Sequence, residues 1–221
     1  SADTIGLPGV RTFTVANVTG DAGADLLVSS VINNSNGPGG SLIKTGDGTM
    51  SLINTTNTYT GETDVQAGTL SLGDSSVPGS MASIENSNVF VRTGAALSGN
   101  GTTGNLTVDT GGLLTPGFSA GTMNVMGNLD LMGSLLVEFE SAGGVAGMHH
   151  DLVNVNGTVD LGGGTLNATY IGGGSFTPTF KQKFLIIDND GGDAVIAPFA
   201  SHAPASSVFV DGQELKIYYD E

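Results

Sequence analysis

The residues of this chain best suited to bind a ligand are three carboxylates in one short segment, Asp188, Asp190 and Asp193, separated by Asn and Gly. Oxygen-rich turns bind Ca²⁺ when several oxygens converge on one point. The spacing differs from that of an EF-hand loop, which also needs a distant bidentate Glu. Two interpretations follow: a calcium site at Asp188, Asp190 and Asp193, or a solvated turn whose side chains bond to their own backbone.

A second candidate is the run His149-His150-Asp151, which offers two imidazoles and a carboxylate to a metal ion. Neighbouring side chains on an extended chain point in opposite directions, so both imidazoles rarely reach one ion. We therefore expect His149 and His150 to be exposed loop residues.

No set of residues matches a known catalytic arrangement. Glycosidases and lyases need clustered acids, or acids beside a cation, whereas most carboxylates here stand alone in turns. The Gly runs at 162–164 and 172–174 lack the Lys of a phosphate loop. We predict that the chain is not an enzyme, with a carbohydrate-active β-helix enzyme as the alternative from that class.

The elements that must position these residues are short β-strands. Apolar residues alternate with polar ones, which places one side chain inside and the next outside. Gly and Asn between the runs supply turns. We expect one core to contain Leu106, Val108, Met123, Val125, Leu129, Leu131, Leu135, Val137, Phe139, Val153, Val155, Val159 and Leu161.

Other segments predict strands with different surroundings. Residues 12–18 alternate as a strand, whereas residues 1–10 have no clear period. The run 184–187 is apolar on both faces, as in a strand covered on both sides. Residues 207–210 and 214–219 predict a closing hairpin around Asp211-Gly212.

The segment from Leu42 to Leu70 carries the most ordered pattern. It contains Leu42, Lys44, Gly46, Gly48, Thr49, Asn57, Thr58, Tyr59, Gly61, Thr63, Val65, Gly68, Thr69 and Leu70 at fixed places. This set resembles the autotransporter-associated β-strand repeat. Stretches at 104–117, 119–122, 151–157 and 184–191 look like other parts of the same proteins.

The resemblance implies an all-β fold, a right-handed parallel β-helix (β-solenoid), on the surface of or secreted by a Gram-negative-type bacterium. The right-handed sense also follows from the preference of parallel crossovers. We expect a single domain over residues 1–221, with an N-terminal end segment at 1–11, the repeat motif at 42–70 and a C-terminal end strand within 207–221.

Composition excludes several classes of function. The net charge of −15 over 221 residues disfavours binding to nucleic acid. The absence of Cys excludes disulfides and thiol chemistry. No apolar run approaches the roughly 18 residues of a membrane helix, so no transmembrane segment is expected. We expect no cofactor other than Ca²⁺.

Stacked coils leave two ends with unpaired strand edges, which natural repeat proteins cap or pair with another chain. We therefore predict a structural protein that self-associates through its solenoid ends into a filament or surface layer. The alternative is an adhesin or passenger module whose loops at 33–40 and 141–150 bind a glycan or a cell-surface partner.

Overall fold

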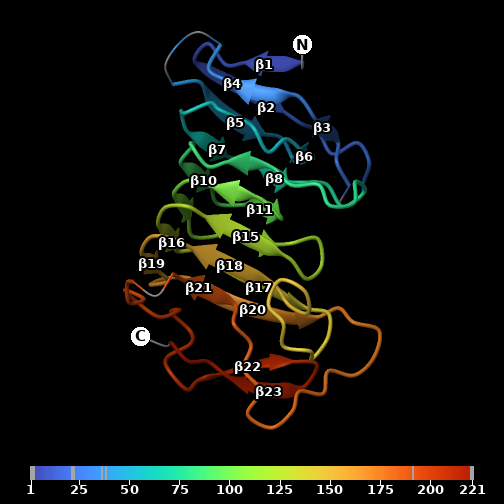
Figure 1. The fold of residues 1–221 in the computed structure, drawn as a ribbon, viewed down its shortest axis with the longest axis vertical. Coiled ribbons are helices and arrows are strands. Elements are labelled where there is room, and N and C mark those ends of the chain that lie inside the picture. Colours follow the sequence, from blue (N-terminus) through green and yellow to red (C-terminus); the bar gives the residue numbers. More distant parts are fainter. Residues whose placement is uncertain (1–2, 21–22, 36, 38, 191, 220–221) are drawn as a thin grey trace.

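The computed structural model describes residues 3–20, 23–35, 37, 39–190 and 192–219, and all regular elements in these ranges are β-strands. The described part of the chain contains no helix of the length and hydropathy that a membrane span requires. The strands stack along one long axis, with β1 near one end and the last strands at the other (Figure 1).

Three parallel sheets form the walls of the rod. The first contains β2 (Val10–Thr14), β5 (Ser41–Thr45), β7 (Thr63–Val65), β10 (Val89–Val91), β13 (Leu106–Val108), β16 (Leu129–Leu131) and β19 (Val159–Asp160). The second contains β3 (Leu26–Val28), β6 (Thr49–Leu52), β8 (Gly68–Leu72), β11 (Ala95–Gly99), β14 (Leu113–Pro116), β17 (Ser134–Phe139) and β20 (Thr165–Tyr170). The third contains β9 (Ser83–Ile84), β12 (Thr102–Thr103), β15 (Thr122–Val125), β18 (Leu152–Val155) and β21 (Ile187–Asn189), while β1 (Thr4–Gly6) pairs with β4 (Val31–Asn33).

Successive strands pass from one sheet to the next and return to the first one coil later, so each seven-stranded sheet receives one strand per coil. This arrangement is a parallel β-helix, and the fold class predicted from the sequence is confirmed. The repeat segment supplies β5, β6, β7 and β8, which belong to two successive coils.

The core is a set of ladders in which equivalent residues stack on one another. One ladder in the second sheet consists of Met50, Leu70, Leu97, Leu114, Leu135 and Leu166, paired in register from coil to coil. Each of these side chains is buried, and burying one such side chain contributes about 1.5–3 kcal/mol. The thirteen inward positions expected from the alternation are all buried.

The C-terminal end of the rod is closed by the predicted hairpin. β22 (Ser207–Val210) pairs antiparallel with β23 (Gln213–Lys216), and β22 lies beside β20 at the lower end of Figure 1. Val210 of β22 is buried, as is Phe176, and the Asp211 carboxylate accepts a hydrogen bond of 3.0 Å from the Phe176 N–H. The strand predicted to reach Tyr219 ends at Lys216.

Two local predictions were wrong. The strand predicted at 12–18 lies instead at Val10–Thr14, where the chain pairs with β5. The segment at 1–10, which has no clear period, contains β1, which pairs with β4. Pairing with a neighbouring strand, and not the local pattern, sets the limits of both strands. The run 184–187 is no doubly covered strand: Leu185 is 51% exposed, and only Ile187 belongs to β21. Leu185 and the following Asp188 both face solvent, so an apolar run in this segment has only one side to bury.

Candidate functional site

Several polar side chains of the repeat are buried inside the rod, namely those of Lys44, Ser51, Asn57 and Thr63. Lys44 is fully buried, and its ammonium donates hydrogen bonds to the carbonyl oxygens of Gly46 at 2.7 Å and Ala67 at 2.8 Å, with a longer one of 3.3 Å to Thr45. Burial lowers the pKa of Lys44, against the opposing effect of the Asp47 carboxylate. Lys44 therefore joins the corners of two successive coils.

A chain of buried hydroxyl groups lies at the start of β7, whereas the Lys44 hydrogen bonds lie beyond its end. The Ser87 hydroxyl donates to the Gly61 carbonyl at 2.7 Å. The Thr63 hydroxyl must then donate to Ser87 over 2.8 Å, and the Tyr59 hydroxyl to Thr63 over 2.7 Å. Burial raises the pKa of Tyr59 to about 12, so this phenol stays protonated and serves as a structural donor.

Asn57 ties three coils together. Its side-chain oxygen accepts a hydrogen bond of 2.8 Å from the Ile32 N–H of one coil. Its amide nitrogen donates to the carbonyls of Asn54 at 2.7 Å and Ser83 at 3.0 Å, the latter in the following coil. Both the oxygen and the nitrogen of this buried amide form hydrogen bonds to neighbouring coils. Asn57 therefore stabilises the stacking of the coils.

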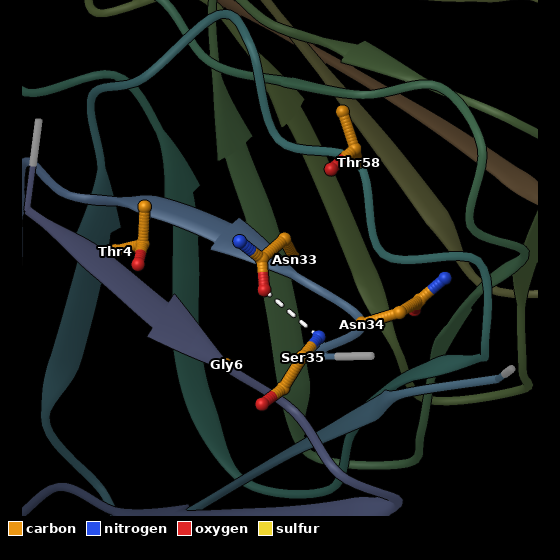
Figure 2. Close-up of a pocket in the computed structure, with 6 residues that line it drawn as sticks. All are labelled: Thr4, Gly6, Asn33, Asn34, Ser35 and Thr58. Carbon is orange, nitrogen blue, oxygen red and sulfur yellow. Dashed lines mark hydrogen bonds between the residues drawn. The ribbon is translucent and has the colours of Figure 1, made fainter. Parts of the chain in front are cut away.

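An open polar depression of about 560 Å³ lies beside the first coils. Figure 2 shows its lining residues, with the Ser35 N–H donating to the Asn33 side chain at 2.9 Å. The neighbouring Asn34 holds the loop by accepting from the N–H groups of Gly40 and Thr60. The depression is lined by Thr4, Gly6, Asn33, Asn34, Ser35 and Thr58. It is suited to polar ligands, and its described lining residues carry no group for acid–base chemistry.

The proposed calcium ligands lie at the last strand of the third sheet. Asp188 and Asp190 are exposed at positions two apart, so both project from its outer face. Asp190 accepts a hydrogen bond from the Gly192 N–H at 3.1 Å, and the Asp193 carbonyl accepts one from Asn189. Within the described ranges no three His, Asp or Glu side chains are placed to hold a metal ion. Calcium binding at Asp188, Asp190 and Asp193 stays a prediction.

His150 is buried, so the prediction of two exposed loop histidines was wrong. Its ring stacks on Phe139 at 5.4 Å, and Nε2 donates to the Leu185 carbonyl at 2.9 Å. Burial lowers the pKa of His150, so the ring is neutral. The loop between β17 and β18 folds back on the core. The polar residues next to His150 in the sequence do not indicate this return.

Asp151 is also buried and anchors that loop. Its two carboxylate oxygens accept hydrogen bonds from the N–H groups of Gly121 at 2.9 Å and Glu138 at 2.8 Å. Burial raises the pKa of Asp151 to about 8 in spite of these donors. His150 and Asp151 make separate structural contacts, and the structure does not bring them together as ligands for one ion.

The outer face of the third sheet contains a polar groove that sequence reasoning missed. The groove has a volume of about 340 Å³. Pairing in register aligns Ser83, Thr102, Asn124, Asn154 and Asp188 in one row along the rod. The separations of these residues in the sequence follow no fixed period, so only the strand register places them together.

Comparison with known proteins agrees with this geometry. Residues 42–72 match the family model described as "Passenger-associated-transport-repeat".

Residues 42–72 are therefore similar to a passenger-associated transport repeat.

This matched segment spans β5 to β8. It contains Lys44, Asn57 and Thr63, whose side chains form hydrogen bonds between successive coils. The chain is also similar to an "Extracellular serine protease" of Serratia marcescens, with 39% identity over 94 residues. The matched part is 42% of this chain, and it spans about 8% of the length of that protein. The repeat and the relative support an extracellular passenger domain, and they confirm the expected secreted or cell-surface location in a Gram-negative-type bacterium.

Proposed function

We propose that this chain is a structural, non-catalytic module of an extracellular passenger, which associates with other copies through the ends of its rod. The observation that supports this most directly is where large apolar side chains are exposed. Between residues 31 and 139 of the described structure, only Met81 and Met126 are of this kind. The others lie toward the ends: Val10, Val18 and Leu27 at one, and Val145, Met148, Ile171, Phe180, Leu185, Ile196, Phe209 and Tyr218 at the other.

The N-terminal coil also offers backbone groups to a partner. Val15 donates its N–H to the Thr45 carbonyl, and the Gly9 carbonyl accepts from Ser41. Because alternate residues of a parallel strand bond to the same neighbour, Thr12 directs its N–H away from β5. The outer edge of β2 has no paired strand among the described residues, and such an edge is a template for pairing with another chain.

The opposite end differs, because the β22–β23 hairpin covers the last coil there. Contact at that end would use exposed side chains such as Phe209 and Tyr218. Two unlike ends that join head to tail produce an open filament, whereas pairing of like ends stops at a dimer. We favour head-to-tail contact, because exposed apolar residues occur at both ends.

Light scattering after size-exclusion chromatography, with negative-stain electron microscopy, tests this proposal. Wild type should form elongated particles that lengthen as concentration rises. Thr12→Pro removes the outward N–H but no β2–β5 hydrogen bond, so it should shorten these particles at unchanged circular dichroism; Thr12→Ala is the matched control. Monomers alone at every concentration, or filaments unaffected by Thr12→Pro, would contradict association through this edge.

A second candidate function is adhesion through surface loops. The polar depression formed by the loop at 33–35 with Thr4 and Thr58 supports it, since ligand sites are concave and carry a few converging polar groups. Binding to host cells or to a glycan array should then be lost when Asn33 and Asn34 are replaced by Ala. Retained binding in that variant would exclude the depression as the contact.

A further inference from the structure

The groove on the third sheet presents hydrogen-bonding groups in a fixed order. Asn154 Nδ2 donates to Asn124 Oδ1 at 3.0 Å. This bond orients both amides, so the Asn154 oxygen remains as an acceptor and the Asn124 nitrogen as a donor toward solvent. The side chains of Thr102 and Glu85, which also line the groove, make no hydrogen bond within the described part of the chain.

The row extends along the axis of the rod. Thr102, Asn124, Asn154 and Asp188 lie on four neighbouring strands. Strands are spaced about 4.8 Å apart, so this row is roughly 14 Å long. A ligand that contacts every member must therefore be extended, with polar groups repeated along its length.

We propose that this groove binds an uncharged oligosaccharide. Sugar hydroxyls both donate and accept hydrogen bonds, which matches amides, a hydroxyl and carboxylates in one row. Among the described residues, the groove lining contains Glu85, Asp188 and Asp190 and no Lys or Arg, so acidic sugars would be repelled. Met126, 48% exposed at the groove, supplies an apolar surface for the C–H face of a sugar ring.

The proposal deepens the adhesive role given as the second candidate, but it places the contact on a sheet face instead of the loops. It is independent of association through the ends. The face lies on the side of the rod, so it would stay accessible in a filament built head to tail.

Isothermal titration calorimetry with uncharged oligosaccharides built from glucose, mannose, galactose or N-acetylglucosamine tests the proposal, in EDTA and again in CaCl₂. At least one should bind. The double variant Thr102→Ala, Asn124→Ala should weaken that binding about tenfold or more, because two hydrogen bonds are lost. Asn167→Ala is the matched control, since Asn167 is exposed on β20 in another sheet, and it should bind like wild type.

The side-chain amide signals of Asn124 and Asn154 in nitrogen–proton correlation spectra give a second readout, because the bound sugar should shift them. The proposal is overturned if folded wild type binds none of these oligosaccharides. It is also overturned if only acidic sugars or Ca²⁺ alone bind, or if the double variant binds as tightly as wild type. If only an Asn33→Ala, Asn34→Ala variant lost binding, the contact would lie in the loops instead. The structural role is tested separately by particle length, which does not depend on sugar binding.

Discussion

Replacing Lys44 by Met tests whether the repeat's buried lysine stabilises the stack. Met retains an apolar side chain of similar length, so the change removes the ammonium with little change in packing. The carbonyl oxygens of Thr45, Gly46 and Ala67 would each lose the ammonium as a donor, although the Thr45 oxygen keeps the Val15 N–H. Lys44 joins two coils, so the lost contacts act between repeating units.

Two opposing effects set the size of the change. The two short bonds to a charged donor contribute about 1.5 kcal/mol each and the longer one about 0.5 kcal/mol, at the lower end of measured values. Against this, wild type bears the desolvation of a buried ammonium, which is why the pKa of Lys44 is lowered. We expect a net loss of about 2–3 kcal/mol in the free energy of unfolding, or roughly 5–10 °C in Tm for a chain of this size.

Urea unfolding followed by circular dichroism at pH 7 measures this difference. Lys216→Met is the matched control, because Lys216 pairs with Glu214 at 2.6 Å on the surface, with both side chains about half exposed. That variant should lose no more than about 1 kcal/mol. If Lys44→Met were as stable as wild type or more so, the desolvation of the ammonium would outweigh its three hydrogen bonds, and the stapling role would be refuted.

Four other changes test separate parts of the structure. Asn57→Asp places a carboxylate against two carbonyl oxygens inside the rod and should lower the free energy of unfolding by about 3 kcal/mol or more. Its control is Asn167→Asp on the surface, which should change the free energy of unfolding by no more than about 0.5 kcal/mol in the same urea assay. Hydrogen bonds from backbone N–H groups lower the pKa of Asp25 to about 2, so its contribution to stability is complete above pH 4 and disappears as the pH falls toward 2. Asp25→Asn should therefore make the free energy of unfolding less dependent on pH in that window. An acid-unfolding curve identical to that of wild type would count against this. Gly68→Ala should lower the free energy of unfolding by about 1–3 kcal/mol, because Gly68 has a φ of +62° and an added Cβ would lie 2.5 Å from a carbonyl oxygen. A thermal melt like that of wild type would show that the backbone at this corner can relax. Leu97→Ala should cost about 2–5 kcal/mol by opening a cavity in the leucine ladder, and a loss below 1 kcal/mol would mean that the coils close around the gap.

Local patterns in the sequence were sufficient for the fold class, the inward positions and the closing hairpin. Alternation over three to six residues decides which side chains of a strand face the core, and this does not depend on where the neighbouring coil lies. The order of Gly, Asn and Thr at 42–70, through its resemblance to a known β-strand repeat, also predicted coils in this segment. The sequence could not show that Lys44 and Asn57 are inside, because their burial depends on partners such as Ala67 and Ser83 in other coils.

Two features were decided by the tertiary structure alone. His150 is buried because a loop returns to the aromatic residues Phe139 and Phe184, and no local pattern records that return. The row of Thr102, Asn124 and Asn154 exists because parallel pairing aligns residues separated by loops of unequal length. Alternation determines which way each side chain points, but only the register between coils determines which side chains become neighbours.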